Sequence, residues 1–438
     1  MRNIQAAVLI FSFFISTSAL ALSGKLESLT EYFPKDLGAS TNTVTPRLGI
    51  ELDQDGKINK QYRYSFKGTF QSNLVSKYQP ENYFADLYEA YVEYKPTRKF
   101  KTIIGWNTVN WGVMDIYSPM DVVNQHTYFD PLNSAKRGAP MVNFQWNPRG
   151  WEISAMYIPF QAKAIFPSND SRWLPRNTIN NVAINYQGSR GQALLTNPVT
   201  YDIQNPVTVN SALNNNFGLN LVKHFDSLDL HAMYFNGAAS TPSFLLDTTG
   251  GTFQSLPPNL VIKLDNPIIL HPMFYRTQTS AFGFSANLGD VILRGESAYV
   301  ATVPPPDAYN VTPWMWQSGI GLEKNWDLGS TTLTQLVHYY YAKYPDQGGN
   351  LPDSGYRIFD NTPMIGFRWA INDEKYFYAS VLYNVTQDGI FWIAGYSEKL
   401  TDALRWDISW RDISAKKDGL LKTYGDNDHA VIDLTYFF

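Results

Sequence analysis

The sequence predicts an all-β fold: a transmembrane antiparallel β-barrel of about 18 strands, with 16 as the alternative count. Three observations predict it. In residues 429–438 every even position is apolar and the odd positions are mostly polar, which is the period of a strand with one apolar face. After residue 21, no stretch approaches the roughly 18 apolar residues of a transmembrane helix, and only helices and closed barrels satisfy their backbone groups in lipid. Long connections alternate with short ones along the chain, as expected for extracellular loops and periplasmic turns.

Residues 1–21 have the pattern of a secretory signal peptide, with a basic start at Arg2, an apolar run and the cleavage site Ala19-Leu20-Ala21. The mature chain would then begin at Leu22, and residues 22–438 would form the barrel. The alternative is a membrane anchor helix. Serine and threonine residues interrupt the apolar run, so cleavage is favoured.

Charge and cysteine content exclude several function classes. Removing the signal peptide takes Arg2 from 35 basic and 39 acidic residues, which leaves 34 minus 39, or −5. This balance is too mild to indicate nucleic acid or an acidic partner. The chain has no cysteine, which excludes disulfides and thiol chemistry.

The first strands are predicted at residues 24–32 and 45–52, and Asp53-Gln54-Asp55-Gly56 is predicted to be the turn that follows. The clearest strand covers residues 61–71, where four even positions are aromatic and the odd positions are polar. The remaining strands are predicted at residues 83–95, 99–108, 141–146, 151–160, 215–224, 229–235, 277–288, 291–301, 314–324, 330–341, 364–371, 376–384, 390–399, 404–413 and 429–438.

Pairing of the strands at 61–71 and 83–95 tests which face is polar. Folding one back on the other sets Arg63 beside Glu93 and Lys67 beside Glu89. Opposite charges directly across an antiparallel pair are favourable, and all four lie on one predicted face. The register therefore supports a polar interior.

Two connections are predicted to be long external loops, residues 161–214 and residues 236–274. Residues 161–214 are too many for a simple connection between two strands. It could lie over the mouth, fold inward as a constriction, or remain a mobile outer loop. A further long connection, residues 109–140, is predicted on the same side of the barrel.

A barrel of 16 to 18 strands leaves an aqueous channel, so the charged residues of the inner face are the candidate site. We predict that the following residues line the pore: Arg63, Lys67, Glu89, Glu93, Lys101, Glu152, Arg294, Glu296, Arg368, Arg405, Asp407, Arg411 and Asp433. Many of them are expected to be mutual ion-pair partners that keep the wall hydrated, such as Arg63 with Glu93. Arg405 and Arg411 give a slight basic excess near the seam, which predicts a mild preference for anionic or polar solutes.

The sequence does not indicate an enzyme or a cofactor. The six histidines are scattered, and the neighbours Asp229 and His231, like Asp428 and His429, are expected to be incidental. There is no glycine-rich phosphate loop and no cluster with metal-ligand spacing. The alternative of a Ca²⁺ site rests on three loop carboxylates, Asp115, Asp121 and Asp130.

One segment resembles a known family. The stretch Gly105-Trp106-Asn107-Thr108-Val109-Asn110-Trp111-Gly112, continued by Met114-Asp115 and Ser118-Pro119-Met120-Asp121, resembles part of a porin-like outer-membrane family described as a domain of unknown function. Trp106 stands where that family commonly has Arg. The final strand, which ends on Phe438, resembles the C-terminal strand of bacterial outer-membrane barrels, whose terminal Phe is read by the assembly machinery. The resemblance implies a porin-like protein of a Gram-negative outer membrane.

The sequence therefore predicts a passive, porin-like channel for small solutes in the bacterial outer membrane. Its expected partners are outer-membrane lipid, the barrel-assembly machinery and small solutes, without nucleic acid, and homo-oligomerisation is left open. The alternative is a surface binding or adhesion protein that uses the loops 161–214 and 236–274. A third hypothesis, an outer-membrane hydrolase, would require His429 or a serine at the rim.

Overall fold

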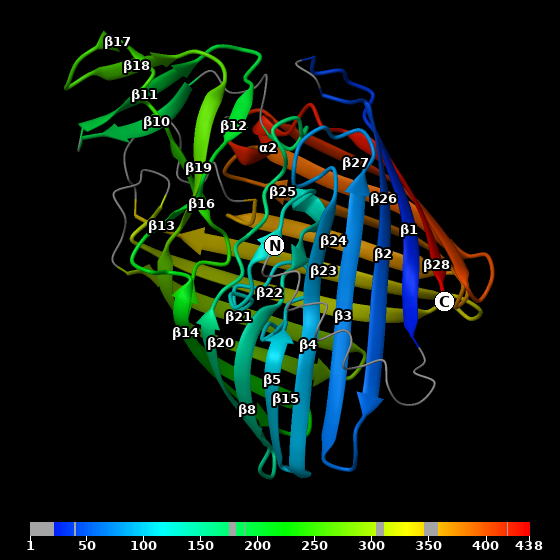
Figure 1. The fold of residues 1–438 in the computed structure, drawn as a ribbon. Coiled ribbons are helices and arrows are strands. Elements are labelled where there is room, and N and C mark those ends of the chain that lie inside the picture. The colour runs from blue at the N-terminus through cyan, green and yellow to red at the C-terminus, as the bar shows by residue number, and fades with distance from the viewer. Residues whose placement is uncertain are drawn as a thin grey trace.

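The structure, a computed structural model, describes residues 22–38, 41–174, 181–187, 189–303, 311–345, 358–417 and 419–438. Within them, 18 strands form one closed ring in which each strand pairs antiparallel with the next and the last pairs with the first (Figure 1). In ring order the strands are β1 (Ser23–Tyr32), β2 (Val44–Lys57), β3 (Tyr62–Asn73), β4 (Phe84–Thr97), β5 (Phe100–Asn107), β8 (Ala139–Trp146), β9 (Trp151–Phe160), β14 (Asn214–His224), β15 (Leu228–Ala238), β20 (Arg276–Leu288), β21 (Val291–Thr302), β22 (Trp314–Asp327), β23 (Thr332–Lys343), β24 (Thr362–Ala370), β25 (Lys375–Asn384), β26 (Gly389–Lys399), β27 (Leu404–Ala415) and β28 (His429–Phe437). The prediction of an all-β, antiparallel barrel of about 18 strands is confirmed.

The predicted turn Asp53-Gln54-Asp55-Gly56 is wrong. These four residues continue β2, and the turn to β3 comes later, at residues 58–61. The physical reason is pairing with the next strand: Gly56 lies opposite Tyr64, and Asp55 lies opposite Ser65. Cross-strand hydrogen bonding overrides the local turn preference of Asp and Gly.

Connection length differs between the two ends of the ring. One end, the short-turn end, carries tight turns, including residues 58–61, 98–99 and 147–150, and both ends of the barrel chain. The other, the long-loop end, carries connections such as 108–138, 161–213 and 239–275. Residues 385–388 are an exception, because they form a tight turn at the long-loop end.

The two faces of the wall differ in chemistry. Along the strands, one parity points outward and is mostly apolar, while the other points into the ring. Examples from strands all around the ring, each between 42% and 56% exposed, are Leu48, Ile104, Phe144, Leu219, Phe282, Ile320, Ile365 and Ile432. A continuous apolar band therefore surrounds the barrel.

The ring closes where β28 meets β1. Eight residue pairs join the two strands, from Lys25 opposite Phe437 to Tyr32 opposite Ala430. The backbone N–H of residue 24 donates to the carbonyl of Phe438 (3.0 Å), and the N–H of Phe438 donates back (3.1 Å). The last residue thus completes the ladder between first and last strands.

Glycine at position 24 makes this closure possible, and its replacement is the first test. A Cβ there would lie 2.4 Å from the backbone oxygen of Glu51 and 2.7 Å from the ring of Phe438. Because backbone cannot rotate away, we expect Gly24→Ala to cost about 1–3 kcal/mol and to lower the yield of folded barrel, measured by heat-modifiable electrophoretic migration. Gly49→Ala, whose Cβ would have its nearest neighbours at 3.8 Å, is the matched control. Equal yields of the two variants would contradict this account.

Two long connections build a small lobe beside the long-loop end (Figure 1). Its first sheet contains β10 (Asn181–Tyr186), β11 (Ser189–Leu195), β18 (Leu260–Leu264) and β17 (Thr252–Ser255), and its second contains β12 (Tyr201–Ile203), β13 (Val207–Thr208), β16 (Ser243–Leu246) and β19 (Ile268–Phe274). β11 pairs with β18, and β12 and β13 pair with β19, in parallel, so the two connections hold each other. Ile184, Val199, Tyr201, Leu260 and Ile262 belong to its apolar cluster.

Helical structure is minor in the described residues. It consists of the 3₁₀ turn η1 (Pro131–Asn133) and the short helix α2 (Leu420–Thr423). Among these residues, no helix is long and apolar enough to cross a membrane. The predicted signal peptide, residues 1–21, lies outside the described residues.

Candidate functional site

Residues 108–138, here called the inner loop, join β5 to β8 and lie inside the ring. They include β6 (His126–Thr127), β7 (Ala135–Lys136) and η1. The first half of the loop contacts the inner faces of β21, β22 and β23, and the second half contacts β4 and β27. β4 and β21 are the fourth and eleventh strands of the ring, so these contacts come from nearly opposite sides. The inner loop therefore crosses the lumen.

Glu296 on β21 anchors the first half of the inner loop. Its carboxylate accepts hydrogen bonds from the backbone N–H of Val113 (2.5 Å), Met114 (2.8 Å) and Met120 (3.0 Å), and from the hydroxyl of Ser118 (2.7 Å). The residue is only 4% exposed. Hydrogen bonds to a charged group contribute about 1.5–3 kcal/mol each, so this one carboxylate fixes two turns of the loop.

Apolar contacts also hold the first half of the inner loop against the wall. Trp111 and Met120 belong to a buried cluster with Met156 on β9 and Phe235 on β15. Glycines on the wall give the loop room: a Cβ on Gly218 would lie 2.6 Å from the Trp111 ring, and a Cβ on Gly283 would lie 2.8 Å from the Met120 sulfur. The wall is therefore apolar beneath Trp111 and Met120, instead of polar throughout.

The second half of the loop is tied to the wall by ion pairs. Arg137 donates twice to Asp86 on β4 (2.6 and 2.8 Å), and Asp130 accepts from Arg411 on β27 (2.8 Å). Burial lowers the pKa of His126 and raises the pKa of Tyr128 to about 12. Both rings are therefore uncharged at neutral pH, and the fixed charges of this half are the paired ones.

Residues 161–174, here called the strap, follow β9 and lie between the inner loop and the connections of the long-loop end. The N–H of Ser168 donates to Glu81 (2.9 Å), and Asp170 accepts from the N–H of Lys77 (3.0 Å). Trp173 is 2% exposed and contacts the rings of Phe33 and His429. The strap thus links β1 and the β3–β4 connection to the β28 side of the seam.

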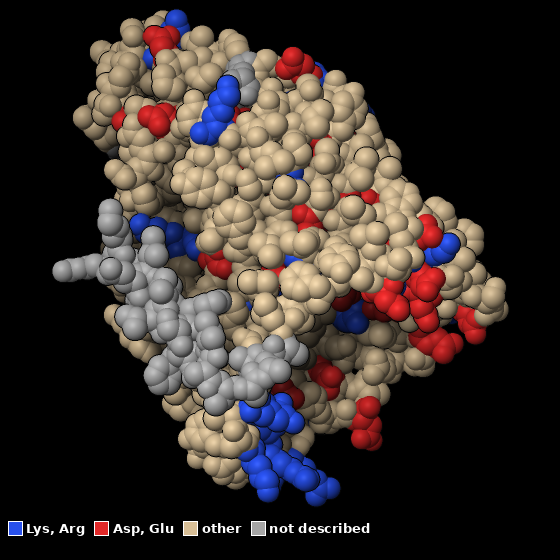
Figure 2. Space-filling model, turned by 45° about the vertical axis from the view of Figure 1, so that its right-hand side comes forward, with Lys and Arg blue, Asp and Glu red and all other residues tan. Residues whose placement is uncertain are grey.

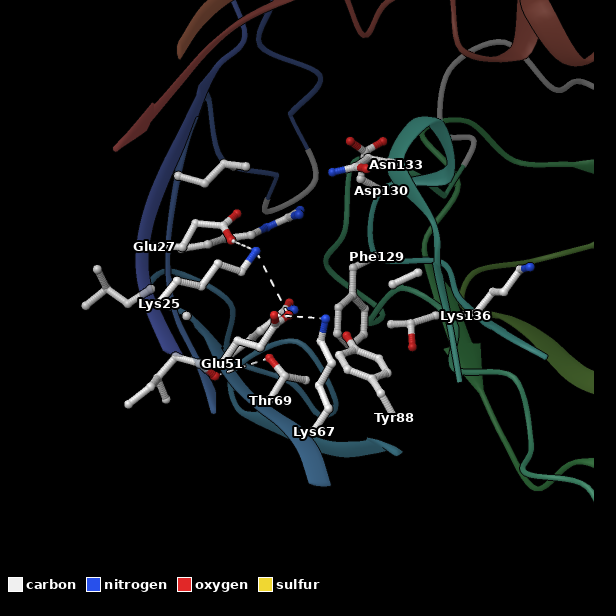
Figure 3. Close-up of a pocket in the computed structure, with 18 of the residues that line it drawn as sticks. Lys25, Glu27, Glu51, Lys67, Thr69, Tyr88, Phe129, Asp130, Asn133 and Lys136 are labelled. Atoms are coloured by element: carbon white, nitrogen blue, oxygen red, sulfur yellow. Dashed lines mark hydrogen bonds and ion pairs between the residues drawn. The ribbon is translucent and has the colours of Figure 1, made fainter. Parts of the chain in front are cut away.

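A cavity of about 380 Å³ remains between the inner loop and the wall of β1–β4 (Figure 3). On the wall side, Lys25 lies 3.1 Å from Glu27 and 4.0 Å from Glu51, and Lys67 lies 3.1 Å from Glu51. On the loop side, Phe129 faces this row of charges. Tyr88 and Lys136 also line the cavity.

Five of the predicted site residues lie on β3, β4 and β5. Arg63 is opposite Glu93 and Lys67 is opposite Glu89, so the predicted register is confirmed. The predicted ion pairs are different, however. Lys67 pairs with Glu51 on the other neighbouring strand, and Glu93 pairs with Lys101 (3.6 Å), because each side chain can reach either neighbour of its strand.

Three predicted residues hold the inner loop or its partners. Glu296 is the buried anchor described above. Arg294 lies 2.6 Å from both Asp115 and Glu323, and Arg411 is paired with Asp130. The expected basic excess at the seam is therefore reduced, because the charge of Arg411 is neutralised.

The other predicted residues lie apart from the inner loop contacts. Glu152 pairs with His224 (3.4 Å), and the guanidinium of Arg368 stacks over Tyr376. Asp407 accepts from the hydroxyl of Tyr378 (2.8 Å) and is opposite Asp433 across the β27–β28 pair. Arg405 has no ion pair among the described residues.

Sequence reasoning named only Arg63 of a basic group at the short-turn end. Figure 2 shows Lys and Arg side chains gathered at the bottom of the view, where the short turns of β2–β5 lie in Figure 1. The exposed side chains of this group, here called the basic rim, are Lys57, Lys60, Arg63, Lys95, Arg98 and Lys99. Within the described residues, none of them forms an ion pair. Their density in two neighbouring turns of the sequence was the available signal.

The predicted Ca²⁺ alternative and the histidine pairs can be placed as well. Asp115, Asp121 and Asp130 each pair with a different cation, so they do not form one site. Asp428 accepts from the N–H of Ile413, whereas His429 stacks on Phe33. Over the described parts of the chain, no group of three or more His, Asp or Glu side chains could hold a metal ion.

Comparison with known proteins gives structural neighbours only. No family model and no curated protein matches the chain. Solved structures similar to it include Salmonella typhi OmpF in complex with daunomycin (13% identity, 96% of this chain and 97% of that one, TM-score 0.45), a mutant of the Rh. blastica porin (12%, 96% and 100%, 0.40) and Vibrio cholerae OmpT lacking loop L8 (10%, 96% and 99%, 0.40). At these TM-scores the architecture rests on the strand pairing of this chain itself. The family resemblance of residues 105–121 stays a prediction.

Proposed function

We propose that this protein is an outer-membrane channel for passive diffusion of small solutes, and that the inner loop sets its width. The observation that carries the proposal is the combination of a closed strand ring with an exposed apolar outer face and a charged inner wall. Closed barrels can cross lipid because every strand edge is paired, and 18 strands enclose enough space for water. The long-loop end would face outward, as in barrels inserted from the periplasm.

The proposed partners follow from the same surfaces. The apolar band would contact outer-membrane lipid, the last strand with Phe438 would be read by the assembly machinery, and small solutes would pass the predicted pore-lining residues. The proposal allows a homo-oligomer. It includes no cofactor and no catalytic step.

Reconstitution in planar bilayers tests the channel. We expect discrete conductance steps in salt solution, and uptake of small solutes into liposomes that contain the protein. A folded, inserted protein that gives neither conductance nor uptake would refute the proposal. Folding is checked independently by β-sheet circular dichroism and heat-modifiable migration.

The basic rim should set the ion preference of such a channel. Replacing Lys57, Lys60, Lys95 and Arg98 by Gln is expected to lower the anion-to-cation permeability ratio roughly two- to fivefold at low salt, with a smaller change at about 1 M salt, where the screening length falls to about 3 Å. The reversal potential under a salt gradient measures this ratio. Replacing Lys263, a lobe lysine, together with three other exposed lysines outside the rim controls for net charge. An equal change in both proteins would exclude a local effect of the rim.

A surface binding function is the second candidate, favoured by one observation. The two predicted external loops are partly folded into the lobe, which has its own apolar cluster and parallel strand pairs. A simple connection between two barrel strands needs neither its own apolar cluster nor paired strands. If deletion of residues 181–208 and 243–273 abolished attachment to a ligand and left conductance unchanged, the binding role would be the better account.

A further inference from the structure

The cavity beside β1–β4 has two walls of different chemistry. Glu27, Lys25, Glu51 and Lys67 form one continuous row of alternating charge across β1, β2 and β3. Their side chains are between 22% and 34% exposed. The opposite wall carries the Phe129 ring, and Figure 3 shows the row of charges and this ring facing the same space.

The charges around the cavity cancel. Four basic residues line it, and so do four acidic ones: Lys25, Arg47, Lys67 and Lys136 against Glu27, Glu51, Glu89 and Asp130. Each of the four cations lies in an ion pair. A solute anion would have to break such a pair to reach a cation, which leaves a partly buried charge without its partner. The cavity therefore disfavours simple anions.

A hydroxyl group meets no such obstacle. It can accept a hydrogen bond from an ammonium group and donate one to the adjacent carboxylate at the same time. The row offers this donor and acceptor pair repeatedly, at Lys25 with Glu27 and at Lys67 with Glu51. A molecule with several neighbouring hydroxyl groups can use the row without disturbing its ion pairs.

The aromatic wall suits the other face of the same kind of molecule. Phe129 is held by an edge-to-face contact with Phe84, with ring centroids 5.1 Å apart. Phe129 is 7% exposed, and the accessible part of this rigid ring provides a small apolar surface for the C–H face of a sugar at little entropic cost. The volume of about 380 Å³ falls within the range of small-molecule sites, roughly 300–1,000 Å³.

We propose that this cavity is a binding site for neutral, polyhydroxylated solutes of mono- or disaccharide size. The inference deepens the proposed channel function, since it names the solute class that the channel would favour. The row of paired charges bonds the hydroxyl groups, and Phe129 packs against the apolar face of the ring.

Maltose and sucrose serve as probes, with glycine betaine and sodium gluconate as a zwitterion and an anion of small size. Binding to the full-length protein in detergent is measured by isothermal titration calorimetry, and block of the current is measured in planar bilayers. We expect at least one sugar to bind and to block the current, and Phe129→Ala to weaken its binding about tenfold. Phe253→Ala, which removes an exposed lobe ring, is the matched control and should leave sugar binding unchanged.

A second variant tests the row of charges. Glu51→Gln removes the carboxylate shared by Lys25 and Lys67, so sugar binding should weaken and gluconate should begin to block. Glu374→Gln, in a turn far along the chain, is its control. Conductance without sugar binding, or stronger binding of betaine or gluconate to the unmodified protein, would overturn the site and leave the channel intact. Sugar binding without conductance would support the site and refute the channel.

Discussion

Glu296→Ala is expected to raise the single-channel conductance and the current noise of the reconstituted protein. The substitution removes the acceptor of three backbone N–H groups and one hydroxyl of the inner loop. Each buried N–H group that is left without a partner costs about 1–3 kcal/mol. The loss of three such partners should exceed the free energy that holds the loop against the wall. The loop should leave the wall of β21–β23 for part of the time, and the lumen should widen.

Two variants separate this effect from a general weakening of the barrel. Glu296→Gln keeps one acceptor oxygen, so its conductance should lie between those of the unmodified protein and Glu296→Ala. Glu152→Ala removes a different inner-wall carboxylate, which pairs with His224, and should change the noise little. An unchanged conductance in correctly folded Glu296→Ala would show that the inner loop does not limit flow.

Trp173→Ala is expected to loosen the strap at the long-loop end and to increase the conductance of the channel. Trp173 packs with Ile413 and Leu421 and contacts the ring of Tyr424. Replacing a buried Trp by Ala usually costs about 3–5 kcal/mol. Here most of the lost stabilisation should appear as local opening of the strap, and the barrel should stay folded, because the strap does not belong to the strand ring. Limited proteolysis within residues 161–174 measures the opening directly.

The control for this variant is Trp146→Ala, which removes a Trp on the outer face that is 51% exposed. It should leave both proteolysis and conductance unchanged. Faster cleavage without a change in conductance would mean that the strap is a structural tie and does not restrict the pore. The double variant with Glu296→Ala should conduct more than either single variant, since the two anchors hold different segments.

Much of the barrel could be predicted because its information is local. Each strand shows period-two alternation, and a face that meets an apolar environment must be apolar at every second residue. Tyr62, Phe66 and Ile432 on one parity, against Arg63 and Asp433 on the other, were enough to assign the faces. Cross-strand charge also fixed the register of β3 and β4, because Arg63 and Glu93 are direct neighbours.

The inner loop could not be predicted in this way. Residues 108–138 contain Val109, Trp111, Met114 and Met120, a density of apolar side chains that an exposed loop would not carry. This signal indicates burial, but it does not say against what. Only the fold places Glu296, about 180 residues away in sequence, within reach of this loop. The ion pairs of Lys67 and Arg411 escaped prediction for the same reason.

The sequence by itself determined the fold class, the approximate number and positions of the strands of the ring, and which face of most of these strands is apolar. These properties depend on a repeating pattern of single residues, so they can be counted along the chain. Tertiary structure alone decided which connection enters the lumen, how the two longest connections combine into a lobe, and which charges neutralise each other. Those outcomes depend on contacts between segments that are far apart in the sequence, and a local residue pattern does not record such contacts.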